Sequence, residues 1–494
     1  MSKKLPIFYS ALMLTAVNLA LRFVSTSFQV FISGRLGAAG VGLLQLVMSV
    51  GSLAMTAGMA GIRTATMYLT AEELGKGRPG NVKWILGGCL AYCLVCSGTL
   101  ALGLYWGAPL IAAHWIGNTD TVGALRLFAA FLPMVCLCGC MSGYFTAANR
   151  IGTLAIVEIG EQLASMTATM AGLLLWAGDD PGKACAAVVF GSGIGACITA
   201  LSLLFLRLRE PRYHAPRIPV TSRLIHTAVP LALADDLKIG INTVESLMVP
   251  KRLAMYPGTA DPLAAFGMVS GMVFPVLMFP AAILFALAEL LIPELAQCRA
   301  AGSRTRIQYL AKRSLRLSLL YGCVFSGGMY LLSEFLCLRL YQSTEAGEML
   351  RLYAILIPML YCDAITDAMN KGLGQQNTAV RYNILTAVLD VVGLYFLLPR
   401  FGMTGYFVSF LISHLVNFLL SLNLLTRTSG IAIPFYIPAL SIAATLAAVY
   451  GAGFVTGAVW QILTYLGMLG SLLVLFGVVS MEDLRWFRGL VAKK

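Results

Sequence analysis

The stretch RLIHTAVPLALADDLKIGINTVESLMVPKRL, residues 223–253, is the most informative part of the sequence. It is long enough to cross a membrane as a helix, which takes about 20 mainly apolar residues. Its middle nevertheless holds Asp235, Asp236, Lys238 and Glu245. Ionisable groups inside a span are costly unless they face a polar cavity or one another. The stretch therefore predicts a transmembrane helix that lines a path for a substrate or an ion.

The composition is typical of a polytopic membrane protein. The 494 residues are 59% hydrophobic and 12% charged, whereas about a quarter of the residues are charged in soluble domains. Apolar segments lie at 9–33, 41–66, 84–111, 123–147, 153–177, 183–206, 224–249, 263–292, 314–333, 350–370, 380–399, 402–426, 432–456 and 460–480. We therefore predict an all-α bundle of 14 transmembrane helices, the first an uncleaved span, with no large soluble domain.

Lysine and arginine are unevenly distributed between alternate connecting segments. With the N-terminus inside, the inner segments hold about two thirds of the 35 basic residues, as the positive-inside rule requires. Both termini are therefore predicted to be cytoplasmic. The same asymmetry explains the net charge of +13 through anionic lipid, so no nucleic-acid partner is expected.

An internal repeat predicts two parallel six-helix halves. An Arg-Leu pair follows the first span at 35–36 and the seventh at 252–253, and MSVGS at 48–52 corresponds to MVSGM at 268–272. Arginines and prolines gather in 207–223, which indicates a linker. The predicted organisation is a six-helix half at 1–206, a basic cytoplasmic linker at 207–223, a second six-helix half at 224–427, and a terminal helix pair with a cytoplasmic tail at 428–494.

Three of the basic side chains within or beside the predicted spans are candidates to face one cavity. Arg22 and Lys238 precede the two Arg-Leu pairs by nearly equal intervals, so the repeat places them on equivalent helices. Arg63 lies near the inner end of the second span. Three cations facing a water-filled cavity suit a pyrophosphate or an acidic sugar, because a guanidinium binds phosphate through two hydrogen bonds. Alternatively, Arg63 extends to the membrane interface and Arg22 pairs with a carboxylate.

The polar residues of the seventh span share one helical face. Asp235, Lys238, Asn242 and Glu245 follow the spacing i, i+3, i+7 and i+10. A polar stripe of that length predicts a cavity, in which these residues contact the substrate or balance its charge. A structural ion pair between Asp235 and Lys238 is the alternative. Asp236 lies off this face.

Other carboxylates at helical spacing are candidates for a coupling-ion site. They are Glu158 and Glu161 in the fifth span and Asp363 and Asp367 in the tenth. Such groups bind a proton or Na⁺, or they form hydrogen bonds between helices. Asp390, His414 and Asn417 lie in spans eleven and twelve. We expect His414 to be a satisfied bundle histidine and not a proton relay.

The sequence contains no signature of catalysis. It has no Walker motif, Ser-His-Asp set or metal-ligand cluster, so we predict neither an enzyme nor a bound metal or cofactor. The 12 cysteines lie in or beside apolar segments and are interpreted as packing residues. Gly267 and Gly271 form a GxxxG pattern, which predicts a close helix contact.

Five segments carry a resemblance to a known family. They are RLGAAGVGLLQLV at 35–47, AGIRTATMYLTAEELGKG at 60–77, VPKRL at 249–253, FGMVSGMVFPVLMFPAAILFALAELLIPELAQCRAAG at 266–302 and RFGMTGYFVSFLISHLVNFLL at 400–420. The chain resembles the stage V sporulation protein B group of polysaccharide transporters. That group belongs to the multidrug/oligosaccharidyl-lipid/polysaccharide exporter superfamily, with the lipid II flippases as relatives.

The resemblance implies a flippase with a central cavity in the bacterial cytoplasmic membrane. The implied cargo is an undecaprenyl-pyrophosphate-linked sugar, a cell-wall or polysaccharide precursor, moved by alternating access. Transport would be driven by H⁺, Na⁺ or the membrane potential. The protein would act as a monomer. The resemblance also implies that Arg22 lines a cationic cavity and that the last two spans hold the polyprenyl tail. Lipid II flippases carry a further Arg-Asp pair, whereas this sequence has Ser27, Phe28 and Gln29 in that region.

Two other functions fit parts of the sequence. A drug or organic-cation antiporter of the same superfamily would bind its cargo through the carboxylates, with the cations incidental. A membrane glycosyltransferase or polymerase would act on the same lipid, but such enzymes commonly present a sizeable polar catalytic loop, and the outer loops here are short. The sequence favours the flippase.

Overall fold

A computed structural model of the chain describes residues 4–178, 180–210, 221–432, 434 and 436–478, with side chains from Phe23 onward except at 151, 221, 230, 231 and 234. These residues form helices and no strand, so the predicted all-α class is confirmed. The α-helices are α1 (Lys4–Met59), α2 (Ile62–Gly75), α3 (Val82–Leu110), α4 (Val122–Ala147), α5 (Ile151–Gly172), α6 (Pro181–Leu208), α7 (Thr221–Leu253), α8 (Pro262–Met268), α9 (Phe274–Met278), α10 (Ala281–Ala300), α11 (Arg304–Tyr341), α12 (Thr344–Ala354), α13 (Ile357–Gly372), α14 (Gln376–Ser429), α15 (Tyr436–Ala452) and α16 (Ala458–Leu475).

The chain consists of two compact units. Unit 1 comprises residues up to Gly271 together with Leu394–Gly402, and unit 2 comprises Met272–Gly393 together with the chain from Met403 onward. The predicted linker at 207–223 lies largely outside the described residues. The division into two six-helix halves and a terminal pair stays a prediction.

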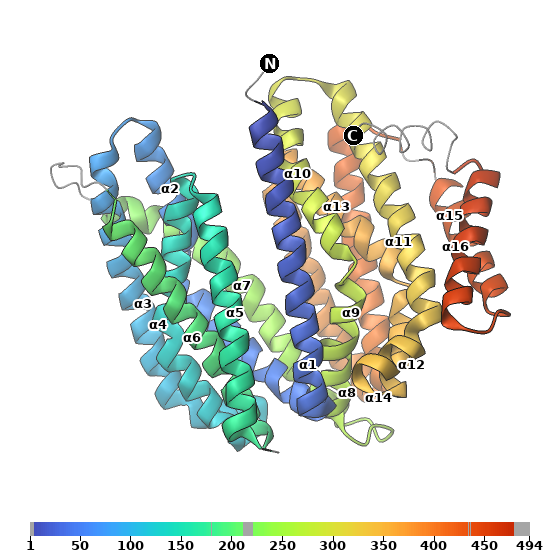
Figure 1. Ribbon diagram of the computed structural model, residues 1–494, viewed down its shortest axis with the longest axis horizontal. Helices are drawn as coiled ribbons and strands as arrows, with labels where there is room; N and C mark the ends of the chain where they lie inside the picture. Colours follow the sequence, from blue (N-terminus) through green and yellow to red (C-terminus); the bar gives the residue numbers. More distant parts are fainter. Residues whose placement is uncertain (1–3, 179, 211–220, 433, 435, 479–494) are drawn as a thin grey trace. The chain divides into compact units, whose positions relative to one another are not determined.

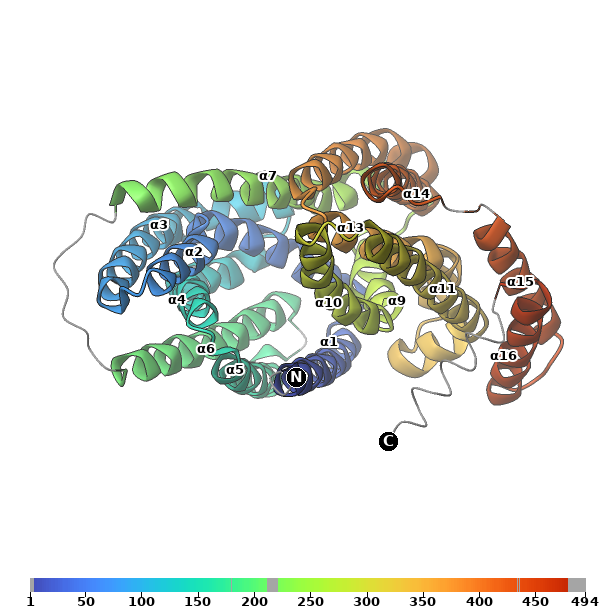
Figure 2. The ribbon, with the colours of Figure 1, turned by 90° about the horizontal axis from the view of Figure 1, so that it is seen from above.

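In unit 1, helices pack in neighbouring pairs. α3 packs against α4, α4 against α6 and α6 against α5, and these four helices run roughly parallel (Figure 1). α7 lies along one side of the unit and α5 with α6 along the opposite side (Figure 2). The core between α2, α3 and α4 includes Cys89, Cys93, Cys136 and Cys140, which are free thiols. The packing role predicted for these cysteines is thus confirmed.

Positive backbone φ angles mark the ends of several predicted spans. The break expected between the first two spans falls at Gly37, with φ 66°, and the break between spans eleven and twelve falls at Gly402, with φ 58°. Another break occurs inside the predicted second span 41–66, because α1 ends at Met59 and α2 begins at Ile62. The intervening Gly61 has φ 70°. Only glycine adopts such angles without steric cost.

Glycine also permits close helix contacts within unit 1. A side-chain carbon added at Gly267 in α8 would lie 2.1 Å from the carbonyl oxygen of Ala38 in α1. One added at Gly271 would lie 2.0 Å from Cγ1 of Val41. Because neither distance allows a side chain, the close contact predicted from the GxxxG pattern is confirmed.

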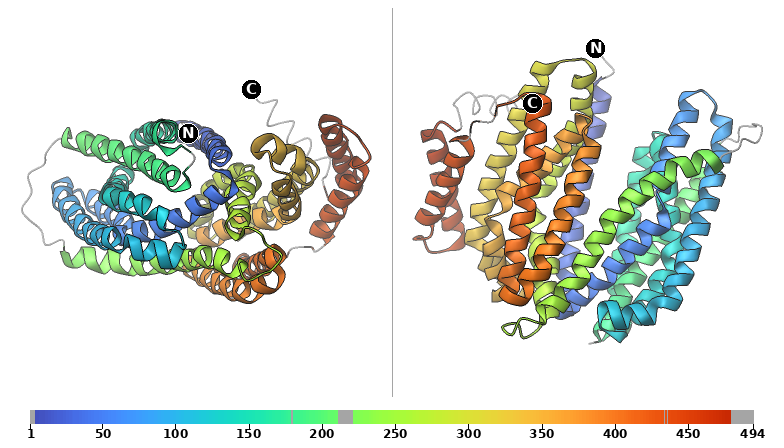
Figure 3. Two further views of the ribbon diagram at one scale, coloured as in Figure 1. Left: turned by 90° about the horizontal axis from the view of Figure 1, so that it is seen from below. Right: turned by 180° about the vertical axis from the view of Figure 1, so that it is seen from behind.

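Unit 2 is built around α11. This helix packs against α12, α13 and α15, and α15 pairs with α16. The hydroxyl of the buried Tyr465 donates a hydrogen bond to the carbonyl oxygen of Cys323, 2.7 Å away, which attaches the α15–α16 pair to α11. The two arms of α14 before and after Gly402 lie side by side (Figure 3).

The described chain has eight helices that are long and apolar enough to cross a membrane, or nine if the bent pair α12–α13 forms one span. A polytopic membrane bundle is therefore confirmed, whereas the count of 14 stays a prediction. α7 is not among the eight because Asp235, Asp236, Lys238 and Glu245 interrupt its apolar sequence.

Candidate functional sites

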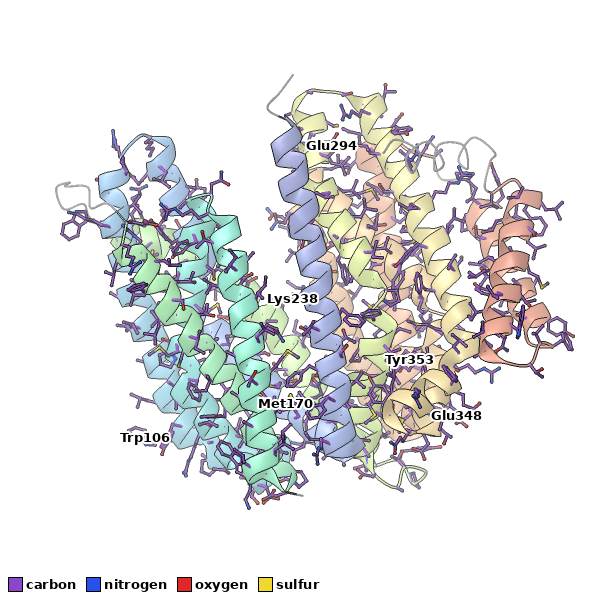
Figure 4. The ribbon with its side chains drawn as sticks, in the orientation of Figure 1. Trp106, Met170, Lys238, Glu294, Glu348 and Tyr353 are labelled. Carbon is purple, nitrogen blue, oxygen red and sulfur yellow. The ribbon has the colours of Figure 1, made fainter. Side chains whose placement is uncertain are left out.

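The predicted polar stripe of α7 lies on the accessible side of the helix. Asp235, Lys238 and Asn242 are exposed, and Glu245 is half-buried (Lys238 is labelled in Figure 4). The buried Thr243 donates a hydrogen bond to the carbonyl oxygen of Ser49 in α1, 3.1 Å away, which fixes the opposite side of α7. The sequence pattern and the packing of α7 thus agree on which face is more accessible.

The alternative of a structural ion pair between Asp235 and Lys238 is not found in the described chain. Among the described residues, neither Asp235 nor Lys238 has an oppositely charged group within 4.0 Å. Asp236 differs from both, because one of its carboxylate oxygens is buried without a hydrogen-bond partner in the described chain. Because this oxygen is buried, Asp236 lies off the exposed face of the stripe.

Arg63 lies in the first turn of α2, where its side chain is exposed. It is within electrostatic range of Glu158, an exposed carboxylate on α5, but the two form no ion pair. Glu161, one turn further along α5, accepts a hydrogen bond from the Thr199 hydroxyl of α6, 2.9 Å away. The side chain of Arg22 in α1 lies outside the described residues. Unit 1 therefore brings two predicted site residues of opposite charge, Arg63 of α2 and Glu158 of α5, near each other.

A network of charged groups that the sequence did not reveal fixes the start of α7. Arg223 donates one hydrogen bond to Glu73, at 2.9 Å, and another to Glu72, at 2.8 Å. The Asn81 amide donates to the other oxygen of Glu73, at 2.8 Å. Glu73 is almost fully buried, so this ion pair compensates a carboxylate that would otherwise be costly to bury. The polar stripe of α7 is thus positioned relative to α2.

The candidate coupling-ion residues of unit 2 separate into two environments. The side-chain NH₂ group of Asn417 donates to both carboxylate oxygens of Asp363, at 3.3 Å and 3.0 Å. The Thr386 hydroxyl donates to the side-chain carbonyl oxygen of Asn417, at 3.3 Å. Asp367 instead forms an ion pair with Lys371, at 2.6 Å. Asp363 therefore belongs to an oxygen-rich contact between α13 and the two arms of α14.

Oxygen-rich contacts suit hard monovalent or divalent cations, whose ligands are carboxylate, amide and hydroxyl oxygens. One oxygen each of Asp367 and Asn370 is buried without a hydrogen-bond partner among the described residues. In the same residues, no group of three or more His, Cys, Asp or Glu side chains could hold a metal ion. A cation site at Asp363 would therefore need oxygen atoms of Thr and Asn side chains in addition to the carboxylate.

Comparison with known proteins gives consistent results. A family model described as lipid II flippase MurJ matches residues 84–477. Stage V sporulation protein B of Bacillus subtilis (strain 168) is 22% identical over 468 residues, which covers 92% of this chain and 89% of that protein. A structure titled lipid II flippase MurJ, inward closed conformation, is 11% identical with a TM-score of 0.72, and covers 97% of this chain and 100% of that one.

A second solved structure shows a similar fold. It is an inward-facing multidrug resistance transporter of the MATE family in the MOP superfamily, 12% identical with a TM-score of 0.66. The match covers 85% of this chain and 100% of the other. At these identities, the likeness to both solved structures concerns the fold.

Proposed function

The chain belongs to the lipid II flippase MurJ family, and from this premise we propose that it flips an undecaprenyl-pyrophosphate-linked oligosaccharide across the bacterial cytoplasmic membrane by alternating access. Family membership makes it a multi-pass membrane protein and a flippase or transporter of the MOP superfamily, not a catalyst of a chemical reaction. Its cargo would be a cell-wall or polysaccharide precursor. Both termini would lie in the cytoplasm, which the distribution of basic segments favours.

The free cation of α7 is the observation that carries this proposal. Lys238 is exposed on a polar face, and among the described residues it has no ion-pair partner. A cation inside a membrane protein without a protein partner is available to an anionic group of a ligand. A pyrophosphate offers several charged oxygens for it. We assign Arg22, Arg63 and Lys238 to the pyrophosphate group.

The polar neighbours of Lys238 would bind the rest of the lipid head group. Asp235 and Asn242 are exposed on the same face, and Glu245 follows one turn later. Carboxylate and amide groups of this kind accept or donate hydrogen bonds to sugar hydroxyls. We assign Asp235, Asn242 and Glu245 to sugar or peptide contacts and to balancing the cavity charge.

The polyprenyl tail would lie against the terminal helices. Residues 436–452 and 458–475 contain no charged side chain, and they expose large apolar groups such as Leu446, Tyr450, Trp460 and Leu475. An apolar surface of this kind suits a lipid chain and the surrounding membrane lipid.

A coupled cation would provide the driving force, with or without the membrane potential. Asp363 is the stronger candidate ligand, because the side-chain amide of Asn417 holds its carboxylate in place and the Thr386 hydroxyl hydrogen-bonds to the same Asn417. Asp367 is already paired with Lys371, and Glu161 with Thr199, which makes them weaker candidates. Glu158 is exposed and faces Arg63, which would hold a cation less well.

A second candidate function is an antiporter of drugs or organic cations. It is favoured by Asp235, an exposed carboxylate without an ion-pair partner among the described residues. An organic cation would bind there, and Lys238 would weaken that binding through like charge.

Binding by the purified full-length protein separates the two functions. We expect native mass spectrometry to detect undecaprenyl-pyrophosphate disaccharide bound at least about tenfold more tightly than undecaprenol, because charge-assisted hydrogen bonds contribute about 1.5–3 kcal/mol. Lys238→Gln should remove this preference. Lys251→Gln, which neutralises an exposed lysine at the end of the same helix, should retain it.

The antiporter makes the opposite prediction for a cationic probe. The site recognises cations if ethidium binds, if it displaces the pyrophosphate lipid, and if Asp235→Asn abolishes ethidium binding. In that case the flippase proposal fails. If ethidium does not compete, the antiporter proposal fails.

A further inference from the structure

Basic side chains gather at one end of unit 2, where α10, α11, α13 and α14 each begin or end. These helices are among those long and apolar enough to cross a membrane, with α13 as part of the bent pair α12–α13. Their shared end therefore lies at a surface of the membrane. Its exposed cations are Arg299, Arg304, Arg306, Lys312, Lys371 and Arg427.

Two of these arginines are positioned by glycine turns. The guanidinium group of Arg299 lies against Gly374, in the turn between α13 and α14, where a side-chain carbon would overlap it. The guanidinium group of Arg304 lies against Gly430, where such a carbon would be 2.5 Å from a terminal nitrogen. The two glycines have φ angles of 74° and 68°, which other residues adopt only at a steric cost. The turns therefore leave space for both guanidinium groups.

The start of α11 is attached to the end of α14. The side-chain NH₂ group of Gln308, one turn after Arg304, donates hydrogen bonds to the carbonyl oxygens of Ser429 and Gly430, at 3.2 Å and 3.1 Å. Lys312 follows after another turn on the same side of α11, and it is exposed. Arg304 and Lys312 therefore form a basic row on the side of α11 that contacts the end of α14.

Acidic residues compensate only part of this charge. Glu294 of α10 forms an ion pair with Arg306 (Glu294 is labelled in Figure 4), and Asp367 forms one with Lys371, at 2.6 Å. The remaining cations, for which the described residues offer no ion pair, are Arg299, Arg304, Lys312 and Arg427. These four residues form a cationic rim. Because its like charges repel one another, the rim favours a bound anion.

The chemistry of the rim and its place in the membrane select the ligand. A guanidinium group binds a phosphate through two hydrogen bonds, and a lysine adds the attraction of a point charge. At the end of a membrane span, the abundant phosphate groups are those of phospholipids, and a cluster of cations there favours lipids with net negative charge. We propose that the cationic rim of unit 2 is a binding surface for anionic phospholipid, in which Arg299 and Arg304 bind the phosphate of the head group.

This surface is separate from the pyrophosphate site proposed on α7, because all its residues belong to unit 2. A head group in contact with Arg299 and Arg304 would add to the contacts that join α11 to the end of α14. The bound lipid would therefore stabilise this end of unit 2. The proposed orientation of the chain places the rim on the cytoplasmic side, but binding of the lipid does not depend on that orientation.

Lipid binding by the purified full-length protein tests this surface without any transport. Native mass spectrometry compares phosphatidylglycerol with phosphatidylcholine of the same acyl chains. We expect phosphatidylglycerol to bind at least about tenfold more tightly. The double variant Arg299→Gln, Arg304→Gln should reduce this preference to less than about twofold, since each cation near the lipid contributes a factor of about five. The double variant Arg339→Gln, Arg351→Gln removes the same charge from exposed positions in the last turns of α11 and α12, and should retain the preference.

A third variant and a soluble competitor keep the test decisive. Lys312→Gln leaves both glycine turns untouched and should weaken phosphatidylglycerol binding about fivefold, so it decides the question if the first double variant does not fold. Glycerol phosphate at the same concentration should not displace the lipid, because it lacks the acyl chains. The proposal is overturned if phosphatidylglycerol has no preference over phosphatidylcholine, or if the rim variants bind it as the unaltered protein does. It is also overturned if the control loses the preference equally, or if glycerol phosphate displaces the lipid.

Discussion

Lys238→Gln is expected to lower the rate of lipid flipping by roughly 100-fold, while the protein still inserts and folds. Lys238 is exposed and unpaired among the described residues, so its removal breaks no internal contact of the fold. It would remove a charge-assisted contact with the pyrophosphate, and the loss of such a contact costs about 2–5 kcal/mol. Arg22→Gln is expected to have the same effect, because the sequence repeat makes Arg22 the counterpart of Lys238.

The measurement is the initial flipping rate in proteoliposomes, with protein amount and monodispersity determined in parallel. Lys251→Gln on α7 is the matched control and should retain the full rate. Lys238→Arg should recover most of the activity, because it restores the charge. Full activity of Lys238→Gln would remove this residue from the binding site.

Asp363→Asn is expected to weaken strongly the dependence of flipping on an imposed cation gradient. The Asn417 amide donates to both carboxylate oxygens, so Asp363 is held ready as an oxygen ligand next to Thr386. Asparagine has the same shape but no charge for a cation to bind. Coupling free energies are typically about 1–3 kcal/mol, so we expect stimulation by a Na⁺ or proton gradient to fall about tenfold.

Separate Na⁺ and proton gradients imposed on the same proteoliposomes provide the measurement. Glu348→Gln, at an exposed position on α12, neutralises another carboxylate of unit 2 and should keep the stimulation. If Asp363→Asn responds to the gradients as strongly as the unaltered protein, the coupling ion binds elsewhere.

Local features of the fold could be predicted because they depend on neighbouring residues. Apolar segments predicted the helices and the breaks between them, which fall at Gly37 and Gly402, and the GxxxG pattern predicted the close contact at Gly267. The predicted second span ran to residue 66, but the helix ends at Met59. Hydropathy does not change there, whereas the backbone turns at Gly61.

The candidate sites could be predicted only where one helix carries them. The exposed face of α7 follows from a spacing of three and four residues, which a sequence shows directly. The contact of Arg223 with Glu73 joins residues 150 positions apart, and the hydrogen bond of Ser409 to Asp390 needs the two arms of α14 side by side. Such partners are set by tertiary packing, so a sequence predicts the single residues and not their pairing.

Flipping of a defined undecaprenyl-pyrophosphate disaccharide by the purified full-length protein tests the central claim most directly. A fluorescent head group in proteoliposomes reports which leaflet the lipid occupies, through quenching by a membrane-impermeant reductant. We expect protein-containing vesicles to expose the lipid faster than empty vesicles, and Lys238→Gln vesicles to resemble empty ones. Equal rates in protein-containing and empty vesicles, together with protein-dependent movement of ethidium, would contradict this claim.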